Sequence, residues 1–415
     1  MGVIGLGQRG LQMLCDVVMY YGDVRVVAVC DTYADRAEVG ADAVEKKYGE
    51  RPFTTTDYRK LLTSGLCDAV YIATSWETHL EVAMEAMRNG VIVGLEVGCA
   101  YDIDQCYRFV RTYEETKTPC MMMENCCFGK EELLATALVR AGKLGTVVHC
   151  HGAYSHDLRA EISQGHIIRH YRLDNYRGRN TENYPTHELG PIARLLNINR
   201  GNRMLTLCTM SSKACGLSEY VAARGELRER DPSLADTVWN QGDVVSTIIK
   251  CANGETIVLT HDCSLYRPYS RGNVIQGTKG IYMEDKHSLS IQGMTPEKGG
   301  WDSETWVELD QLWDKIEHPL WKKFQEAGVK GGHGGMDFLV LRAFIEAIRD
   351  NKLVPIDVYD TASWMAITPL SEDSIAKGSA PVAIPDFTNG LWLQPDRPYD
   401  KGTYCLEEIC KPGKL

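Results

Sequence analysis

The residues best suited to chemistry lie in the segment 171–191, which reads YRLDNYRGRNTENYPTHELGP. It contains three Tyr, three Arg and one His within 21 residues, in a chain that is only 8% aromatic. Arg and Asn form hydrogen bonds with hydroxyl groups, Tyr both stacks and forms hydrogen bonds, and His exchanges a proton near neutral pH. This mixture indicates a pocket for a polyhydroxylated, sugar-like ligand.

A second feature with chemical meaning is the motif GxGxxG formed by Gly5, Gly7 and Gly10. These glycines allow a tight turn, a close approach of backbone to a pyrophosphate, and close packing of the following helix. Asp31 ends the next predicted strand, where a carboxylate accepts hydrogen bonds from ribose hydroxyls and repels a 2′-phosphate. The pattern predicts NAD as cofactor rather than NADP, for which Arg36 is one of two candidate partners.

The elements that must position these residues begin with alternating apolar strands and helices. Strands are expected at 2–5, 23–30, 68–74, 91–96 and 120–123, with helices at 10–20, 35–48, 79–89 and 102–116. This alternation predicts a parallel sheet covered by helices. Ligands bind at the carboxyl edge of such a sheet, which is where we expect Trp76, His79, Glu96 and Asn125. A packed Trp76 in a helix-capping loop and a structural Glu96 are the alternatives.

Strands dominate the rest of the chain. They are expected at 146–154, 205–211, 243–251, 256–263, 271–277, 280–284 and 288–292, with helices at 130–141, 336–350 and 360–376. The fold class predicted for the whole chain is α/β. A Rossmann dinucleotide-binding domain occupies residues 1–125, and a substrate-binding α+β domain with a large, mostly antiparallel open sheet occupies 126–415. A Pro-rich tail that wraps this second domain begins at Pro381.

Composition excludes several classes of function. The net charge is −11 and no basic stripe is present, so nucleic acids and anionic membranes are not expected as partners. The apolar runs are shorter than the roughly 20 residues that span a bilayer. The 15 Cys include no CxxC pair, which is typical of a reducing compartment. We expect a cytoplasmic protein without a signal peptide, although Met1 lies almost inside the first strand, so that a native leader could precede the chain.

The glycine motif GLGQRG, Asp31, Glu96 and the strand-rich second half together resemble the Gfo/Idh/MocA oxidoreductase superfamily. The resemblance implies a sugar-handling enzyme with a nicotinamide cofactor. Sugar dehydrogenases of that superfamily carry Glu-Lys-Pro at the fourth strand, where the Lys assists removal of the hydroxyl proton. Here the triplet is Glu96-Val97-Gly98. Val97 has no proton to exchange, which argues against a plain dehydrogenase.

Residues 176–204, YRGRNTENYPTHELGPIARLLNINRGNRM, resemble glycoside hydrolase family 109, whose known members include α-N-acetylgalactosaminidases. The resemblance is most specific at residues 184–187 and looser from Gly5 to Tyr269. Many relatives carry a twin-arginine export signal that this sequence does not show. The resemblance implies contacts with NAD at Arg9, Gly10, Asp31, Trp76 to His79, Glu96, Val97 and Asn125. It implies contacts with a glycoside substrate at Tyr154, Arg172, Tyr184, Pro185, Thr186, His187 and Tyr266.

The resemblance also implies a glycosidase mechanism built on redox chemistry. NAD⁺ oxidises C3 of the sugar, and the ketone acidifies the proton at C2. A base removes this proton, the aglycone leaves from C1, water adds to the enone, and NADH returns the hydride to C3. The cofactor is thereby recycled in each turnover.

Two residues are the expected acid and base groups. Pro185 and Thr186 suit a helix start, so His187 is expected in the first turn, where the helix dipole disfavours an imidazolium. Tyr184 is expected to assist proton transfer at the C3 oxygen or to bind that oxygen. The alternatives are a capping or packed His187 and a core Tyr184.

Three further residues are expected to bind the substrate. Arg172 would bond sugar hydroxyls or an N-acyl carbonyl, and Tyr154 and Tyr266 lie beyond predicted strands where they could line the pocket. A surface salt bridge is the alternative for Arg172.

Other interpretations of the sequence remain open. The chain could be an NAD-dependent sugar or inositol dehydrogenase, or a nucleotide-bound sensor without catalysis. His149 and His151 share one face of a predicted strand, but no third ligand is evident and no metal is expected. His333 lies in a Gly-rich segment that is expected to be a plain connector. By resemblance, the wide exposed sheet predicts a homo-oligomer.

Overall fold

The computed structural model describes residues 1–299, 304–312, 318–326, 328 and 331–394. Two compact units emerge from the contacts within the chain. The described part of the first unit comprises Met1–Phe128 and Lys323–Met365, and that of the second comprises Gly129–Lys322 and the segment from Ala366 to residue 394. The functional division into residues 1–125 and 126–415 stays a prediction. The contacts add residues 323–365 to the N-terminal unit.

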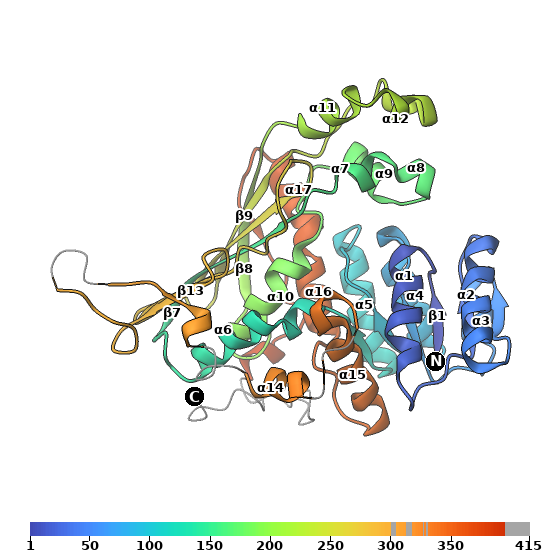
Figure 1. Ribbon diagram of the computed structural model, residues 1–415, viewed down its shortest axis with the longest axis horizontal. Coiled ribbons are helices and arrows are strands. Elements are labelled where there is room, and N and C mark those ends of the chain that lie inside the picture. The colour runs from blue at the N-terminus through green and yellow to red at the C-terminus, as the bar shows by residue number, and fades with distance from the viewer. Residues whose placement is uncertain (300–303, 313–317, 327, 329–330, 395–415) are drawn as a thin grey trace. The chain divides into compact units, whose positions relative to one another are not determined.

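The first unit contains a six-stranded parallel sheet (Figure 1). Its strands are β1 (Gly2–Ile4), β2 (Ala28–Cys30), β3 (Phe53–Thr55), β4 (Ala69–Ile72), β5 (Ile92–Leu95) and β6 (Cys120–Met122), in the order β3-β2-β1-β4-β5-β6. The order reverses between β1 and β4, which makes that place the topological switch point where doubly wound sheets bind nucleotides. The predicted Rossmann fold is confirmed. The predicted strand 23–30 contributes only its last three residues to the sheet.

Helices connect these strands, and among them α3 was not predicted from the sequence. They are α1 (Gln8–Asp16), α2 (Ala34–Tyr48), α3 (Tyr58–Leu62), α4 (Trp76–Arg88) and α5 (Ile103–Thr116), with the short 3₁₀ helices η1 (Val18–Tyr20) and η2 (Asn125–Phe128). The helix expected at 79–89 begins three residues earlier, at Trp76, so residues 76–79 form the first turn of α4.

Two helices from the C-terminal half complete the first unit. These are α15 (Met336–Arg349) and α16 (Val358–Met365), preceded by η5 (His333–Gly335). A Cβ at Gly94 in β5 would lie 3.1 Å from the ring of Phe344 in α15, so the helix packs directly on the sheet. The single helix expected at 360–376 is wrong, because α16 ends at Met365 and α17 (Ile367–Ala376) belongs to the second unit.

The second unit is built on a nine-stranded sheet. Its strands are β7 (Val147–Ser155), β8 (Met204–Ser211), β9 (Val245–Cys251), β10 (Thr256–Asp262), β11 (Val274–Gly277), β12 (Gly280–Met283), β13 (Ser288–Ile291), β14 (Val307–Glu308) and β15 (Val382–Ala383), in the order β14-β13-β12-β11-β7-β10-β9-β8-β15. Among the described pairs, β7 and β10 run parallel and the others run antiparallel. The predicted mostly antiparallel sheet is confirmed. Pro381 leads into the edge strand β15, and the tail beyond residue 394 lies outside the described residues.

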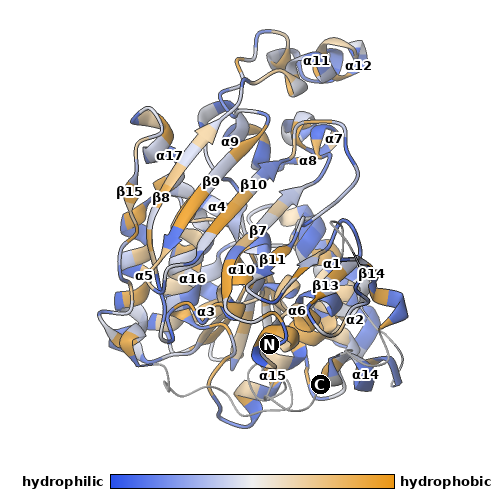
Figure 2. Cartoon of the chain, turned by 90° about the vertical axis from the view of Figure 1, so that its left-hand side faces the viewer, coloured by the Kyte–Doolittle hydropathy of each residue, from blue (hydrophilic) through white to orange (hydrophobic). Residues whose placement is uncertain are grey.

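Helices cover one face of this sheet. The main ones are α6 (Lys130–Arg140), α10 (Pro185–Leu195) and α17. Ile257, Leu259 and His261 of β10 are buried, whereas the alternate residues of the strand face outward and are mostly half-exposed. Figure 2 shows the hydrophobic character of β9 and β10. On the outward face Met210 and Ile248 are 64% and 54% exposed.

The remaining helices of the second unit are short. They are α7 (Arg159–Ser163), α8 (Gly165–Ile168), α9 (Arg172–Gly178), α11 (Gly216–Ala222), α12 (Gly225–Arg230), η3 (Pro232–Leu234), η4 (Leu309–Gln311) and η6 (Leu391–Leu393), while α14 (Pro319–Glu326) crosses the boundary between the units. Within the described ranges, we find no helix that combines the length and apolar character needed to cross a membrane.

Candidate active site

The turn between β1 and α1 has the geometry that a pyrophosphate requires. Gly5 has a φ of +92°, and a Cβ at Gly10 would lie 1.9 Å from the carbonyl oxygen of Gly5. The helix can therefore approach the turn only because Gly10 lacks a side chain. Gly7 is the N-cap of α1, and no side chain among the described residues caps this helix end. A Cβ at Gly7 would meet nothing closer than Arg36 at 3.5 Å. Open amides at a helix N-terminus fit a bound phosphate group.

Asp31 lies directly after β2 at the carboxyl edge of the sheet. Its Oδ2 accepts a hydrogen bond from the amide of Leu6 at 2.7 Å, and its Oδ1 accepts one from the amide of Tyr33 at 2.9 Å. These bonds fix the carboxylate beside the glycine turn. Each oxygen keeps a second lone pair, so Asp31 can still accept a ribose hydroxyl.

A polar network joins the ends of three strands of the first unit. Arg9 donates from Nε to Glu96 Oε1 at 2.9 Å, and from Nη1 and Nη2 to Asp337 Oδ2 and Oδ1 at 2.8 Å each. Tyr71 donates to the same oxygen of Glu96, and Asn125 Nδ2 donates to Asp337 Oδ1 at 2.8 Å. Three residues expected near the nucleotide, Arg9, Glu96 and Asn125, are thus brought together through Asp337.

The charges of this network follow from its contacts. Burial alone would raise the pKa of Asp337, but hydrogen bonds from Arg9 and His333 hold that pKa below its usual range. Burial opposes the charge of Arg9, yet Glu96, Tyr71 and Asp337 raise its pKa. Arg9 is therefore a cation and Asp337 an anion at neutral pH. Asp337 could not be identified from the sequence, because Arg9 and Asn125, which it joins, lie more than 200 residues away along the chain.

Three more expected nucleotide contacts lie at the same sheet edge. Trp76 is the buried first residue of α4. His79 Nε2 lies 2.5 Å from the carbonyl oxygen of Glu96, and burial lowers the pKa of His79. The ring is therefore neutral and donates from Nε2. The amide of Val97 donates to Glu96 Oε2 at 3.0 Å, which fixes the end of β5.

In the second unit, three aromatic residues form a ring cluster, which we define as Tyr154, Tyr184 and His187. The ring centroids of Tyr154 and Tyr184 are 4.6 Å apart, those of Tyr184 and His187 are 4.8 Å apart, and those of Tyr154 and His187 are 5.4 Å apart. Tyr154 comes from the end of β7, and the other two come from the start of α10. Edge-to-face and tilted contacts of this kind fix ring orientations.

Arg172 lies against this cluster. Its Cζ is 5.3 Å from the centroid of the Tyr184 ring, and its Nη1 is 3.1 Å from Glu161 Oε1. Burial opposes the charge on Arg172, but Tyr154 and Glu161 raise its pKa. Burial also raises the pKa of Tyr154, so this phenol is neutral beside a guanidinium. A cation next to two phenols can bind the oxygen atoms of a sugar.

The helix start that was expected at Pro185 is present. Tyr184 is the N-cap of α10 and Pro185 its first residue, so His187 lies in the first turn. Thr186 is buried between them. The position of His187 therefore has the helix dipole that was expected.

Tyr266 does not join the ring cluster. Its side chain is 86% exposed, and its centroid lies 5.7 Å from Cζ of Arg159. Instead, His156 and Tyr269 contact Tyr154, with centroid distances of 6.1 and 6.3 Å. Sequence reasoning did not identify these two residues. His156 lies two residues after Tyr154, a spacing that could have suggested it.

Three further histidines were considered from the sequence, two on a predicted strand and one in the Gly-rich segment. His149 and His151 do share one strand face, where His149 Nδ1 is 2.8 Å from Thr256 Oγ1 and His151 Nδ1 is 2.7 Å from the carbonyl oxygen of Gly272. His333 is more than a connector, because its Nδ1 lies 2.7 Å from Asp337 Oδ2. That contact attaches the Gly-rich segment to the polar network of Arg9.

Comparisons with known proteins place this geometry in a family. Residues 1–124 match an oxidoreductase family with an NAD-binding Rossmann fold, and residues 128–394 match the family described as glycosyl hydrolase 109, C-terminal domain. The chain belongs to glycosyl hydrolase family 109. It is a glycosidase with an NAD-binding Rossmann domain, as the resemblance implied.

Relatives of this family 109 protein match over most of its length. A glycosyl hydrolase family 109 protein of Stenotrophomonas maltophilia is 39% identical, over 95% of this chain and 90% of the relative. An alpha-N-acetylgalactosaminidase of Tannerella forsythia is 36% identical, over 94% of this chain and 86% of the relative.

Solved structures share the fold of the family 109 protein at low identity. A myo-inositol 2-dehydrogenase from Lactobacillus plantarum has a TM-score of 0.64 at 15% identity, covering 92% of this chain and 98% of its own. A levoglucosan dehydrogenase in complex with NADH and L-sorbose has a TM-score of 0.65 at 17% identity, covering 93% and 99%. These likenesses confirm the predicted fold class.

Proposed function

We propose that the protein hydrolyses α-N-acetylgalactosaminides, with His187 and Tyr184 as its acid and base groups. The observation that carries the proposal is the ring cluster with Arg172 against it, at the first turn of α10. The Tannerella relative, named as an alpha-N-acetylgalactosaminidase, supports this choice of sugar.

The cofactor fits the first unit. Bound NAD supplies a hydride acceptor for C3 of the sugar and later returns the hydride. Gly5, Gly7 and Gly10 leave room for its pyrophosphate, and Asp31 would hold its adenosine ribose. Arg9, Trp76, His79, Glu96, Val97 and Asn125 are proposed to complete this side of the site.

The residues of the second unit are proposed to move protons and to hold the sugar. His187 removes the C2 proton once C3 is a ketone, and then returns a proton as water adds. Tyr184 exchanges a proton with the C3 oxygen, assisted by the Arg172 cation at 5.3 Å from its ring. Arg172, Tyr154, Pro185 and Thr186 are proposed to line the sugar, and Tyr266 to contact the more exposed part of the glycoside.

A panel of aryl glycosides tests this proposal. Purified enzyme is given NAD⁺ and p-nitrophenyl α-N-acetylgalactosaminide, with the matched galactoside and β-anomer as controls. We expect phenol release without net accumulation of NADH, and faster release from the N-acetyl sugar. Stoichiometric NADH formation from free sugars or inositols, with no phenol released, would show instead a sugar or inositol dehydrogenase.

We propose that the open face of the nine-stranded sheet forms a homo-oligomer. Met210 and Ile248 project from this face and are mostly exposed, and exposed apolar residues on one face suit contact with a second copy. Light scattering of the wild type and of M210E/I248E tests this: the variant is expected to be smaller, and equal masses contradict the proposal.

We also propose a cytoplasmic location. Cys106 and Cys150 are buried thiols that form no disulfide, and burial raises the pKa of each. Such thiols suit a reducing compartment. Cell fractionation should find the protein with a cytoplasmic marker, and recovery with periplasmic proteins contradicts this.

A further inference from the structure

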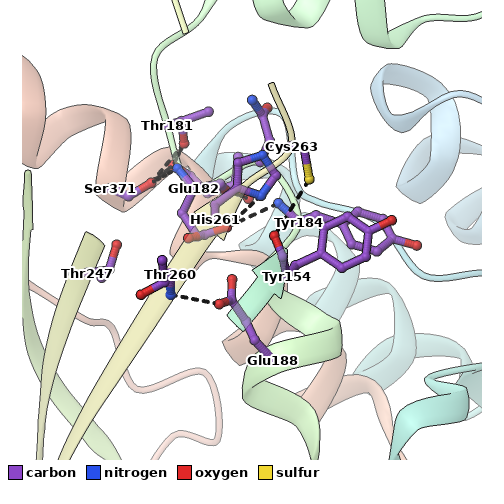
Figure 3. Close-up of polar contacts among 12 residues, drawn as sticks. Tyr154, Thr181, Glu182, Tyr184, Glu188, Thr247, Thr260, His261, Cys263 and Ser371 are labelled. Atoms are coloured by element: carbon purple, nitrogen blue, oxygen red, sulfur yellow. Dashed lines mark hydrogen bonds and ion pairs between the residues drawn. The ribbon is translucent and has the colours of Figure 1, made fainter. Parts of the chain in front are cut away.

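Two buried carboxyl groups lie next to the ring cluster and take no part in the proposed chemistry. Glu182 precedes α10 and Glu188 lies within it, and both are 0% exposed. Figure 3 shows them close to Tyr154, Tyr184 and His261. A buried carboxyl without a salt-bridge partner is costly, so this pair calls for a physical explanation.

Each carboxyl has one oxygen engaged by a backbone amide. Glu182 Oε1 accepts from the amide of Tyr184 at 3.4 Å, and Glu188 Oε2 accepts from the amide of Thr260 at 2.9 Å. The two carboxyl groups are close enough for each to influence the pKa of the other. In the described part of the chain, the other two oxygens, Glu182 Oε2 and Glu188 Oε1, meet no N–H or O–H donor. A single proton held between the carboxyls satisfies both of these oxygens.

We propose that Glu182 and Glu188 share one proton and act as a positioning pair for the ring cluster. Glu182 holds the backbone of Tyr184. Glu188 joins α10 to β10 through the amide of Thr260. This role rests on the proposed function of Tyr184 and His187, whereas the shared proton can be tested without any assay of turnover.

The packing of α10 on the sheet makes this arrangement possible. A Cβ at Gly152 of β7 would lie 2.5 Å from the carbonyl oxygen of Glu188. Only glycine therefore lets α10 approach the sheet closely enough for Glu188 to reach the amide of Thr260 on β10. Glu182 is fixed from the other side, because its amide donates to Ser371 Oγ of α17 at 2.9 Å and its carbonyl accepts from Thr368 at 2.6 Å.

Burial keeps several of the groups that face the pair neutral, and one of the facing groups is a cation. From β10, His261 Nδ1 lies 3.4 Å from Glu182 Oε1, while its Nε2 is 2.7 Å from the hydroxyl of Tyr176 on α9. Burial, reinforced by Arg172, lowers the pKa of His261 to about 3. Burial raises the pKa values of Tyr176 and of Cys263, the residue after β10.

The other facing groups are Tyr154 on β7 and Tyr184 and His187 on α10, with Arg172 of α9 as the cation. On α17 the facing groups are the hydroxyls of Thr368 and Ser371. A pair that carries one negative charge rather than two suits these surroundings.

Burial raises the pKa of both carboxyls, and the neighbouring negative charge raises that of Glu188 further. The folded protein therefore keeps a proton that an unfolded chain releases above about pH 4.3. The stabilisation is complete below that pH and is lost as pH rises toward the raised folded pKa.

Single and double amide variants test the shared proton. In E182Q or E188Q, the NH₂ of the single amide group supplies the hydrogen between the positions of Glu182 Oε2 and Glu188 Oε1. The other oxygen of each side chain still accepts from the amide of Tyr184 or of Thr260. In E182Q/E188Q, either one amide group points its NH₂ at a backbone N–H donor or the two NH₂ groups face each other, so that one hydrogen bond is lost. We therefore expect the decrease in melting temperature of the double variant to exceed the sum of the decreases in the two single variants by on the order of 5 °C.

The control is E188Q/E372Q, because Glu372 on α17 pairs with Arg179 rather than with Glu182 or Glu188. Its effects are expected to add. Additive effects in E182Q/E188Q as well would overturn the shared proton. Loss of folding in that double variant alone, with both single variants folded, is the extreme form of the expected result.

Infrared spectroscopy gives a second readout that does not require the double variant to fold. Wild-type protein with ¹³C-labelled glutamate should show the C=O band of a protonated carboxyl at pH 7, lost as pH rises. E132Q should keep the band, because Glu132 is another buried glutamate whose pKa burial raises to about 7. A wild-type spectrum without it overturns the proposal, whether or not the glycosidase assay succeeds.

A positioning role adds an effect on catalysis. In the wild type, loss of the shared proton at alkaline pH should disturb the ring cluster and lower kcat. E188Q has no shared proton to lose, so the alkaline decline of its kcat should occur at higher pH. An unchanged alkaline limb would show that the pair does not act on the ring cluster.

Discussion

The guanidinium of Arg9 makes two hydrogen bonds of 2.8 Å to the carboxylate of Asp337, which lies 328 residues further along the chain. The same guanidinium contacts Glu96 at the end of β5. A helix from the C-terminal half thereby fixes a side chain of the glycine motif. The residues proposed to bind the nucleotide therefore depend on α15 as well as on the first 128 residues.

Replacing Asp337 by Asn should lower stability in a way that depends on pH. The pKa of Asp337 is depressed in the folded protein, so its stabilisation is present above the unfolded pKa and lost as pH falls through the folded value. We expect D337N to lose about 2 kcal/mol at pH 7, with a smaller difference from the wild type near pH 3. Urea unfolding at both pH values measures this. D350N, at an exposed ion pair, is the control, and an equal loss in both variants contradicts the account.

Replacing Gly10 by Ala should disturb the glycine turn. Its Cβ would lie 1.9 Å from the carbonyl oxygen of Gly5, whereas a Cβ at Gly22 would meet no atom within 4 Å. Crowding of backbone costs about 1–3 kcal/mol. G10A should therefore weaken NADH binding by roughly tenfold or more, and G22A should leave it unchanged. Fluorescence titration with NADH gives both constants, and equal affinities for the two variants would contradict the role of the turn.

Removing the Tyr184 hydroxyl should slow turnover without unfolding the protein. Tyr184 contacts both other rings of the cluster, and an acid–base group contributes about 10²–10⁴-fold in rate. We expect kcat of Y184F to be lower than that of the wild type by about 10²–10⁴-fold. Its melting temperature should change little. Y171F is the matched control, since Tyr171 lies in the same segment but stacks on His170. A Y184F enzyme with full kcat excludes the proposed proton transfer.

Replacing Arg172 by Lys should affect substrate binding more than folding. Lys keeps the charge but loses the planar group that lies over Tyr184. We expect kcat/KM for the N-acetyl sugar to fall by roughly tenfold or more. R177K, later in α9, is the control. Equal kcat/KM values for both variants would exclude Arg172 from the sugar site.

The sequence predicted the elements of the first unit well because its strands are short, continuous apolar runs between amphipathic helices. The strand β3 escaped notice, since Phe53 is exposed and its two neighbours are half-exposed. The helix start at Pro185 was predicted from the proline and threonine alone. Contacts such as Arg9 with Asp337 could not be predicted, because no local pattern links positions so far apart.

The second unit shows a different limit of sequence reasoning. The segment 171–191 was interpreted as a polar pocket wall, yet Glu182, Thr186 and Glu188 within it are fully buried. Charged residues in a polar segment look solvated until packing is known. The signal for His261 was present, because it follows Ile257 and Leu259 at alternate positions of one strand and so shares their buried face.

In the proposed mechanism, the glycoside is cleaved after His187 removes the proton at C2. The most direct test is hydrolysis in D₂O, with the released sugar analysed by NMR. We predict deuterium at C2 of the product in wild-type enzyme, and a loss of turnover of about 10²–10⁴-fold in H187N. A product that retains hydrogen at C2 after complete turnover would contradict the account.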